Sequence, residues 1–447
     1  MTSLDYLFNP SSIALIGASP GESALSRIVL DNLGRFKGRI YPVNPNYKEV
    51  RGLACYPSVR DLPEPVDLSV IMRPAAEIPA IVREHKGRAR CVLVVSAGFA
   101  ETGQGALQQE LVNAGREAGV RILGPNCLGI YNPSSRIDTL FLPRGGLRRP
   151  KSGNVAVLSQ SGAILVCLLD ALSGMGTGVS RAVNYGNAAD LDAPEIYDFL
   201  AHDQETEVVI SYLESVGDGR EFITAARKLA DRKPLLLLKG GKYGSGQGAA
   251  FSHTGRLAGS YEVFSSILLQ FGMREAADFD ALLDAAQALS CRKPAPGERV
   301  SIVTNAGGPG VLAADECLRQ GLLTPSLPET LQVHLRRLFP PFYTVANPVD
   351  LTGQVRDDDY RIALENVRDQ YDGFCVIALT GVAGLSLRLA EILGEFAAST
   401  YKPLTIHIAQ GGVSGKLIPL LARKRIPVYS SPERAVRGLR ALLGGGR

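Results

Sequence analysis

The 447-residue sequence lacks any run of about 20 apolar residues, the length that a membrane-spanning helix requires. Its first residues, MTSLDYLFNPSSIALIG, carry no basic segment ahead of the apolar run, so we expect a buried strand there and not a signal peptide. Lys and Arg total 48 against 44 Asp and Glu, with only a mild basic bias in residues 144–151. This balance argues against nucleic acid binding. We predict a cytoplasmic protein with no nucleic acid and no membrane partner.

Metal-ligand motifs are missing as well. None of the seven cysteines shows the paired spacing of a zinc site, and most lie inside apolar runs such as RCVLVV and DGFCVIAL. An odd number of cysteines in such positions is typical of reduced thiols. Cys127, in GPNCLG, has no histidine near it in sequence, and its apolar neighbours favour a buried thiol over a nucleophile. We therefore predict no metal site.

What the sequence does contain is a repeated alternation of short apolar runs with segments of helical periodicity. This pattern is typical of parallel β-sheets covered by helices. Single cores rarely grow beyond roughly 250 to 300 residues, so several domains are expected. The predicted strands are 12–18, 39–45, 67–74, 90–99 and 121–126, then 154–160, 180–186, 207–215 and 234–241, then 299–308, 372–381, 403–412 and 426–431.

Two breaks divide this pattern into three parts. A loop rich in Pro, Gly and Arg runs from about Asn132 to Gly153, and a polar stretch with two prolines covers residues 290–298. We predict an α/β fold with three doubly wound parallel-sheet domains. They are a Rossmann-like domain at 1–130 and flavodoxin-like domains at 150–292 and 298–447.

Ligands of such sheets bind beyond the carboxyl ends of the strands, so the strand-to-helix loops are the candidate sites. In the first loop a strand ends at Gly17 and opens into a helix whose N-terminus can hold a phosphate. The spacing GxGxxG is absent, and Asn44 and Asn46 stand where a dinucleotide site has an acidic residue. A nicotinamide cofactor is therefore disfavoured, which leaves another nucleotide-bearing ligand or a purely structural turn.

The second loop is LSQSGAILV, residues 158–166. Ser161 ends a strand and Gly162 and Ala163 begin an apolar helix, so small side chains expose backbone amides to an anion. Serine is also a favoured N-cap residue. An anion site and an ordinary capped helix fit this stretch equally well.

The third loop is GGKYGSGQGAAFSHTGRLAGS, residues 240–260. It is not a GxxxxGK[ST] phosphate loop, because Leu236 and Tyr243 occupy the first glycine and the hydroxyl positions. His253 follows the glycine-rich run. A neutral imidazole is a nucleophile when one nitrogen is held as N–H, and Glu214, just past a strand end, is a candidate to hold it. The alternatives are a structural histidine and a solvated acid before a turn.

Several separated motifs agree with one another. GASP, VNPN and GPNCLG lie in the first domain, LSQSGA, YGNAADLD, YLESVGDGREF and SHTGRLAGS in the second, and TNAGGPGVLAAD and NPVDL in the third. Together they resemble the α subunit of NDP-forming acyl-CoA synthetases, a family related to succinyl-CoA synthetase and typified by the ADP-forming acetate–CoA ligases. The resemblance covers essentially the whole chain, in the same domain order.

The resemblance implies a role for each loop. The first domain is expected to bind coenzyme A through Gly17, Ala18, Ser19, Pro20, Val43, Asn44, Pro45 and Asn126. Catalysis is expected at His253, phosphorylated during turnover, with Glu214 as its partner. Ser161, Gly162 and Ala163 are expected to hold phosphate at a helix N-terminus. The implied reaction converts acyl-CoA, phosphate and ADP reversibly to acid, CoA and ATP through an acyl phosphate and a phosphohistidine.

Members of this family bind nucleotide in an ATP-grasp region, fused to the chain or carried by a β subunit, and nothing after Asn305 resembles one. The expected partners are an ATP-grasp β subunit in an α2β2-type assembly, which supplies the Mg-ADP/ATP site, and a small carboxylic acid with its CoA thioester. Arg256 replaces the Ala or Ser that is common there, and either adds a phosphate contact or marks a divergent homologue. A catalytically silent CoA-binding scaffold and a nicotinamide-dependent oxidoreductase are the alternatives.

Overall fold

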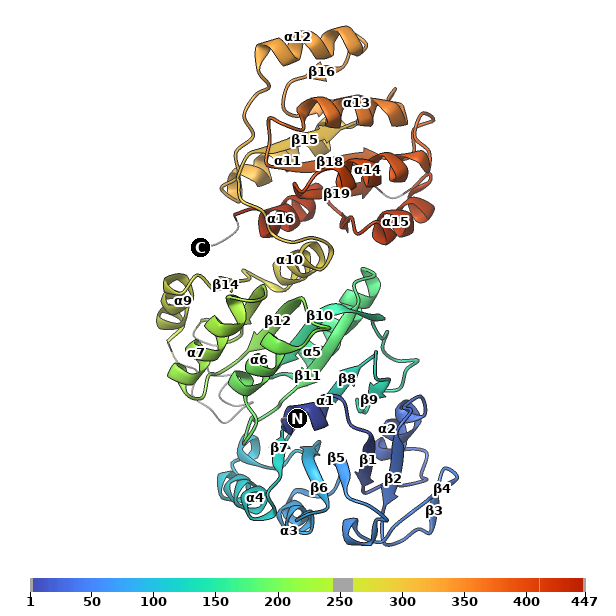
Figure 1. Ribbon diagram of the computed structural model, residues 1–447, viewed down its shortest axis with the longest axis vertical. Coiled ribbons are helices and arrows are strands. Elements are labelled where there is room, and N and C mark those ends of the chain that lie inside the picture. Colours follow the sequence, from blue (N-terminus) through green and yellow to red (C-terminus); the bar gives the residue numbers. More distant parts are fainter. Residues whose placement is uncertain (1–2, 244–259, 410, 445–447) are drawn as a thin grey trace. The chain divides into compact units, whose positions relative to one another are not determined.

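The computed structural model describes residues 3–243, 260–409 and 411–444. The described chain alternates strands with helices and forms three main sheets (Figure 1). It divides into two compact units, Met1–Ala276 and Ala277–Arg447. The predicted α/β class with mostly parallel sheets is confirmed.

The first sheet lies in unit 1 and is parallel throughout, in the order β2-β1-β5-β6-β7. Its strands end slightly before the predicted limits, because polar and glycine residues turn the chain away, as Gly17 does after β1 with φ +88°. The elements are α1 (Ser3–Phe8), β1 (Ser12–Ile16), α2 (Leu25–Leu33), β2 (Arg39–Val43), the hairpin β3 (Glu49–Val50) and β4 (Leu53–Ala54), β5 (Val66–Ile71), α3 (Ile78–Arg83), β6 (Ala89–Val94), α4 (Gly105–Ala118) and β7 (Arg121–Leu123), with 3-10 turns at Val59–Asp61, Ala75–Glu77 and Ala100–Thr102.

The second sheet, also in unit 1, has the order β14-β13-β12-β10-β11-β8-β9. Its strands β10 to β14 are parallel, whereas β8 and β9 add an antiparallel edge. Its elements are β8 (Gly129–Asn132), β9 (Ile137–Asp138), β10 (Ser152–Ser159), α5 (Gly162–Gly174), β11 (Val179–Asn184), α6 (Ala193–His202), β12 (Val208–Leu213), α7 (Gly219–Ala230), β13 (Leu235–Lys239), α9 (Tyr261–Gln270) and β14 (Arg274–Glu275).

The antiparallel edge occupies part of the segment for which the sequence analysis gave only a loop. Strand β8 pairs with β11, where Tyr131 lies opposite Ala182. Ile130 and Tyr131 are buried, and the Tyr131 hydroxyl donates to the carbonyl of Pro150 at 2.7 Å. These buried apolar side chains hold the strand in place despite the proline and glycine residues that follow it.

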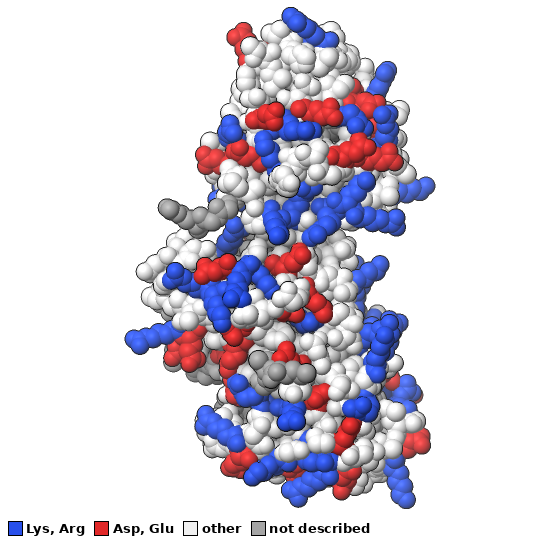
Figure 2. Space-filling model, viewed as in Figure 1, with Lys and Arg blue, Asp and Glu red and all other residues white. Residues whose placement is uncertain are grey.

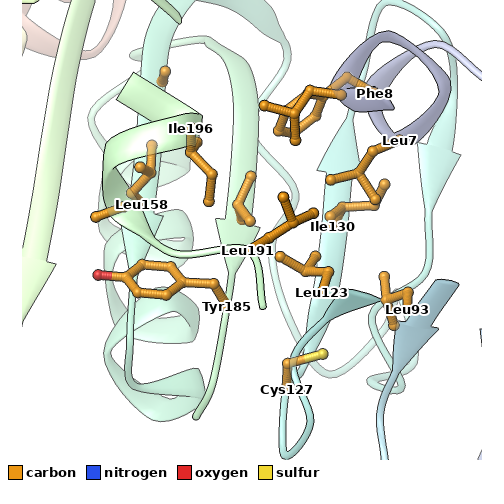
Figure 3. Packing of buried hydrophobic residues seen from close by; sticks show 14 of the residues in the cluster. Leu7, Phe8, Leu93, Leu123, Cys127, Ile130, Leu158, Tyr185, Leu191 and Ile196 are labelled. Carbon is orange, nitrogen blue, oxygen red and sulfur yellow. The ribbon is translucent and has the colours of Figure 1, made fainter. Parts of the chain in front are cut away.

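The two sheets of unit 1 share one apolar cluster (Figure 3). Leu7 and Phe8 of α1 lie there with Leu123 of β7 from the first sheet and with Ile130 of β8 and Leu158 of β10 from the second. Burying a side chain of this size stabilises the fold by about 1.5–3 kcal/mol. The first two predicted domains are therefore packed into one unit around a common core.

Unit 2 contains the third sheet, in the order β16-β17-β15-β18-β19-β20, with β16 antiparallel and the other strands parallel. Its elements are α10 (Phe279–Cys291), β15 (Val300–Thr304), α11 (Gly307–Arg319), α12 (Glu329–Leu338), β16 (Thr344–Val345), β17 (Val349–Asp350), α13 (Asp357–Val367), β18 (Gly373–Leu379), α14 (Arg388–Ser399), β19 (Leu404–Ala409), α15 (Ser414–Arg423), β20 (Val428–Tyr429) and α16 (Pro432–Leu442).

Helix α10 lies in unit 2, whereas the predicted second domain, 150–292, includes it. Its fully buried Asp284 accepts a hydrogen bond from Arg434 of α16 at 2.7 Å. The Tyr429 hydroxyl donates to the Asp284 carbonyl at 2.8 Å. These contacts link residues about 150 positions apart, which no local pattern reveals.

The charged surface is mixed. Figure 2 shows Lys and Arg side chains interspersed with Asp and Glu over the visible face of both units. Within the described ranges, no helix is both long enough and apolar enough to cross a membrane. None of the seven cysteines, all of which are described, forms a disulfide.

A buried histidine makes the first sheet sensitive to acid. His85 is fully buried, with Nδ1 2.8 Å from the Ile81 carbonyl and Nε2 2.8 Å from the Ser69 hydroxyl. The carbonyl only accepts, so Nδ1 donates and Nε2 accepts from Ser69, and the neutral ring satisfies both partners. Burial lowers the pKa of His85 to about 4.

Since an unfolded histidine titrates near 6.5, the unfolded chain binds the proton more readily than the folded one. The free energy of unfolding is therefore expected to fall as the pH drops from about 6.5 to about 4, by up to about 3 kcal/mol from this residue. Urea unfolding of the wild type and of His85→Gln at pH 7, 6 and 5 measures this. The variant should lose that part of the pH slope, and the exposed His202→Gln should keep it. Equal slopes in all three proteins would contradict the assignment.

Candidate active site

A cleft of about 770 Å³ opens in unit 1 beyond the carboxyl ends of the strands. From the first sheet it is lined by the loops that follow β1, β5, β6 and β7, and from the second sheet by the start of α5 and the end of β11. Its lining includes Gly17, Ser19, Met72, Arg73, Ser96, Asn126, Gln160, Gly162, Ala163, Asn184 and Asn187. Residues predicted for CoA and residues predicted for phosphate thus share one cleft.

The turn after β1 is held close to its neighbours. Gly17 has φ +88°, and a Cβ added there would lie 2.5 Å from the carbonyl oxygen of Met72, so the position requires glycine. The amides of Gly17 and Ala18 both donate to the carbonyl of Val43, at 2.9 and 3.3 Å. Asn44 Nδ2 donates to the Ala18 carbonyl at 2.8 Å. Asn44 therefore holds the turn in place, and Ala18 is buried behind it.

Three further first-domain candidates line a neighbouring pocket. Val43, Asn44 and Pro45 line a second pocket of about 210 Å³, and Gly17 and Arg73 line both cavities. Six of the eight candidates of the first domain therefore line one or both of two cavities that share Gly17, whereas Ala18 and Pro20 line neither.

The loop after β7 packs against the loop after β11. Asn126 has φ +56°, and its Nδ2 donates to Asn187 Oδ1 at 3.2 Å. The Asn187 amide donates to the carbonyl of Pro125 at 3.0 Å. A Cβ added at Gly186 would lie 2.3 Å from that same carbonyl oxygen. The two loops are pressed together at the cleft, and the glycine allows it.

Cys127 lies in the wall of this cleft and in the shared core (Figure 3). Its side chain is buried, its Sγ contacts the Val94 carbonyl at 3.2 Å, and burial raises its pKa to about 12. A thiol with this pKa is a poor nucleophile. The predicted buried thiol is confirmed.

Helix α5 points its N-terminus at the cleft. Ser161 is the N-cap residue, and its hydroxyl accepts from the Ile164 amide at 3.4 Å. Gly162 and Ala163 line the cleft, and within the described part of the chain neither of their amides has a protein acceptor. An anion here would bind these two amides, with Ser161 acting as the cap.

Asn184, at the end of β11, fixes the position of this helix start. Its Nδ2 donates to the carbonyls of Ser159 and Gln160, both at 2.8 Å, and its Oδ1 accepts from the Leu128 amide at 2.5 Å. One buried side chain therefore connects the turn before α5 with the loop that carries Asn126.

Asn184→Ala is expected to lower the free energy of unfolding by about 2–4 kcal/mol, because two carbonyls and one amide lose their buried partner. Chemical denaturation of the purified protein measures this loss. Asn113→Ala, which removes an exposed asparagine of α4, is the matched control and should change stability by less than about 0.5 kcal/mol. Equal effects of the two substitutions would show that the network adds little.

Glu214 lies just past β12, beside the end of β10, and is 7% exposed. Gln160 Oε1 accepts from the amides of Ser215, at 2.9 Å, and of Glu214. Lys239 Nζ donates to the Glu214 carbonyl at 2.8 Å. Burial, together with the Glu214 carboxylate, raises the pKa of Tyr212. Gln160 itself lines the cleft, so Glu214 is held directly behind the cleft wall.

His253 and Arg256 lie outside the described residues. Strand β13 ends at Lys239, which pairs with Leu213 of β12, the residue before Glu214. On each side of residues 244–259, a described residue contacts Glu275. Lys242 forms an ion pair with Glu275 at 2.7 Å, and the Tyr261 hydroxyl lies 3.1 Å from the same carboxylate.

Four residues of the cleft were missed by the sequence analysis as site candidates, namely Arg73, Gln160, Asn184 and Asn187. Each lies at the end of an observed strand or in the loop that follows it, so the rule about strand ends applies to them too. Their polar side chains in small-residue loops were the available signal.

Three family models match the chain in succession. Residues 11–133 match a CoA binding domain, residues 152–289 a succinyl-CoA ligase like flavodoxin domain, and residues 300–429 a Ligase-CoA domain. The fold and the cleft, together with these matches, define a CoA ligase of the succinyl-CoA ligase type.

Individual relatives give a more specific assignment than the domain models. The chain is 37% identical to the acetate–CoA ligase [ADP-forming] II subunit alpha of Pyrococcus furiosus, over 98% of this chain and 97% of that one. It is 37% identical to the acetate–CoA ligase [ADP-forming] I of Archaeoglobus fulgidus over 98% of its own length, but spans only 63% of that longer protein. The solved structure of dinucleotide forming acetyl-coenzyme A synthetase 1 from Ca. Korarchaeum cryptofilum, in complex with phosphate and ADP, matches with a TM-score of 0.89 and 35% identity, covering 98% of this chain and 96% of that one.

The chain belongs to the family of ADP-forming acetate–CoA ligases and corresponds to their α subunit. The predicted family and enzyme class are confirmed. Membership of this family argues against a nicotinamide-dependent oxidoreductase. The neutral Asn44, at the position where a dinucleotide site has an acidic residue, agrees with this.

Proposed function

We propose that this chain catalyses the acyl transfer half of an ADP-forming acyl-CoA synthetase. It binds coenzyme A at the Gly17–Pro20 turn, at Val43, Asn44 and Pro45, and at Asn126, and it binds phosphate at the start of α5. The observation that carries the proposal is the single cleft lined by Gly17, Ser19 and Asn126 on one side and by Gly162 and Ala163 on the other. A thioester bound from the first sheet can meet phosphate bound at the second.

In the first step an oxygen of phosphate attacks the thioester carbonyl carbon. The carbon–sulfur bond breaks, CoA leaves as the thiolate and takes up a proton, and the acyl phosphate remains. The amides of Gly162 and Ala163 and the dipole of the 13-residue helix α5 stabilise the negative charge on the phosphate. Both reactants are held at fixed positions, which removes much of the entropic barrier.

In the second step a ring nitrogen of His253 attacks phosphorus, the acid leaves as a carboxylate, and phosphohistidine forms. Glu214 accepts a hydrogen bond from the other ring nitrogen, which keeps the attacking nitrogen unprotonated and stabilises the charge that develops on the ring. Two observations support this pairing: Glu214 is held behind the cleft wall by Gln160 and Lys239, and the segment that contains His253 begins at the adjacent strand end.

The third step passes the phosphoryl group to ADP. We propose that the Mg-nucleotide site is supplied by an ATP-grasp β subunit in an α2β2-type assembly in the cytoplasm. Support comes from relatives named as α subunits that match the chain end to end, and from longer relatives of which it spans about 63%. Acetate is the acid in the names of several relatives, and a small carboxylic acid is proposed here.

The proposal is tested by incubating the chain with an acyl-CoA and labelled phosphate. We expect an acid-labile, base-stable label on the protein and the release of free CoA, both dependent on phosphate. A protein that binds CoA but never acquires label with acetyl, branched, aryl or succinyl thioesters would instead be a silent CoA-binding scaffold.

Glu214→Gln is expected to slow the formation of the phosphohistidine by about 10²-fold or more, because the amide cannot stabilise the charged ring. Rapid-quench measurement of the labelled protein follows this step. Release of CoA in the first turnover should be much less affected, since it precedes the step at His253. Glu207→Gln, at the opposite end of β12, is the matched control. The same loss in both variants would remove Glu214 from the mechanism.

A further inference from the structure

Asn187 connects the cleft to two polar side chains outside its lining. Its side chain is buried, and its Nδ2 donates to Gln108 Oε1 at 2.9 Å and to Glu101 Oε2. Its Oδ1 accepts from Asn126 Nδ2 at 3.2 Å. Both hydrogens of the Asn187 amide are therefore used. Asn187 and Asn126 line the cleft, whereas Glu101 and Gln108 lie outside the lining.

Glu101 belongs to the 3-10 turn after β6, and backbone groups fix its orientation. Its Oε1 accepts from the amides of Gly98, at 2.6 Å, and Phe99, at 3.1 Å. Phe99 is fully buried in the core of the first sheet, which holds this turn in place. Burial raises the pKa of the Glu101 carboxyl, but the hydrogen bonds that it accepts outweigh this effect and lower the pKa below its ordinary value. At neutral pH Glu101 is therefore a carboxylate, which only accepts hydrogen bonds.

These contacts determine which way each side-chain amide faces. Because the carboxylate of Glu101 only accepts, the group of Asn187 that meets it must be Nδ2. Gln108 agrees with this, since its Oε1 also accepts from the Ala100 amide, at 3.4 Å, and so presents an acceptor to Asn187. The Asn187 oxygen then faces Asn126, which must present its Nδ2 in return. The orientation of both asparagines thus follows from the charge of Glu101.

The last amide in this chain of hydrogen bonds is that of Asn126. Its backbone amide donates to the Ser96 carbonyl at 2.9 Å, which fixes the position of the residue. With Nδ2 directed to Asn187, its Oδ1 has no donor within the part of the chain that the structure describes. Asn126 lines the cleft, so this oxygen is left for a ligand. A carbonyl oxygen binds an N–H or O–H group and repels the oxygens of a phosphate.

We propose that Glu101 is a positioning residue of the coenzyme A site, and that it acts through Asn187 to make Asn126 present a hydrogen-bond acceptor to the ligand. This inference rests on the function proposed above. The pantetheine arm of coenzyme A carries amide N–H groups that match such an acceptor, whereas its phosphates do not. Asn126 therefore contacts the pantetheine arm, and phosphate is left to the amides at the start of α5.

Glu101→Gln is expected to reverse the orientation of both asparagines. The amides of Gly98 and Phe99 still require an acceptor, so the new side chain keeps its oxygen there and turns its NH2 group toward Asn187. Asn187 and then Asn126 turn over, and Asn126 presents its NH2 group to the cleft. Calorimetric titration with CoA should show a Kd raised by about tenfold or more, because the ligand N–H then meets a donor.

Asn126→Asp tests the orientation itself, because a carboxylate accepts on both sides. As a single substitution it turns an oxygen toward the Asn187 oxygen, and Kd for CoA should again rise by about tenfold or more. In the double variant Glu101→Gln/Asn126→Asp, the reversed Asn187 donates to the new carboxylate, and an acceptor again faces the cleft. The net charge also equals that of the wild type. The double variant should therefore bind CoA at least about fivefold more tightly than either single variant.

Glu110→Gln is the control, since it removes an exposed carboxylate of α4 that pairs with Arg83 at 3.3 Å, and it should keep the wild-type Kd. The substitutions are isosteric, and melting temperatures check that each variant is folded. An unchanged Kd in Glu101→Gln, or a double variant that binds no more tightly than the better single variant, overturns the role of Glu101 while the proposed function stands. A wild-type chain that binds no CoA overturns both.

Discussion

His253→Asn is expected to abolish the labelled phosphoenzyme and to reduce acyl-CoA-dependent ATP synthesis by at least about 10⁴-fold, because the phosphoryl group loses its covalent carrier. Asparagine keeps a polar side chain but has no ring nitrogen that can be phosphorylated. Autoradiography after incubation with acyl-CoA and labelled phosphate measures the first effect, and a coupled assay with the assembled enzyme measures the second.

The same variant separates the first step from the second. If phosphate attacks the thioester before the histidine acts, His253→Asn still releases CoA and accumulates acyl phosphate. Hydroxylamine traps this product as the hydroxamate, in an amount close to one equivalent per active site. Without CoA release in this variant, the histidine would have to take part in the first step, contrary to the proposed order.

His202→Asn is the matched control, since His202 is exposed at the end of α6 and its Nδ1 contacts the carbonyl of Asp198. It should keep both the label and the turnover. Label that persists in His253→Asn would assign the phosphoryl group to another residue and would remove the central element of the mechanism.

The main strands of this protein were predictable from sequence because a strand that is buried on both faces is a nearly continuous run of apolar residues. SIALI, which became β1, and LLLLK, which became β13, are uninterrupted runs that the structure buries completely. Strand β8 was not predicted, since only four residues form it and its pairing with β11 is antiparallel. Such a short edge strand depends on tertiary contacts, and Tyr131 supplies them.

The site was predictable as a set of loops and not as a set of contacts. The rule that ligands bind beyond the carboxyl ends of parallel strands selected Gly17 and Gly162, the family resemblance added Asn126, and the structure brings all three to one cleft. Asn184 reaches Leu128 across 56 positions, and Gln160 reaches Ser215 across 55. Sequence spacing carries no signal for pairs this far apart, so the residues that support the site were found only in the fold.

Asn44 illustrates the difference between position and role. The family resemblance placed it among the residues that bind coenzyme A. In the structure its Nδ2 is bonded to the Ala18 carbonyl and its Oδ1 accepts from the Asn46 amide at 3.0 Å. Its contribution to the site is to hold the Gly17 turn, while its contact with coenzyme A stays a prediction.

Purified without a partner, the chain is expected to become phosphorylated from acyl-CoA and phosphate and yet to synthesise no ATP from ADP. A site for a nucleoside triphosphate with Mg²⁺ needs cationic side chains to bind the phosphates and carboxylates to bind the metal. The described lining of the cleft provides Arg73, which Glu77 already engages. Luciferase detection of ATP measures the result, with the phosphoenzyme confirmed in the same sample so that inactive protein is recognised.

Addition of an ATP-grasp β subunit should then discharge the phosphoenzyme and produce one ATP for each phosphoryl group lost, raising ATP synthesis from background by at least about 10³-fold. ADP without the subunit should leave the label on the chain, because phosphohistidine is an activated donor that still requires a positioned acceptor. ATP formed at the same rate by the chain alone would place a complete nucleotide site within these 447 residues. It would contradict the proposal that a separate β subunit supplies this site.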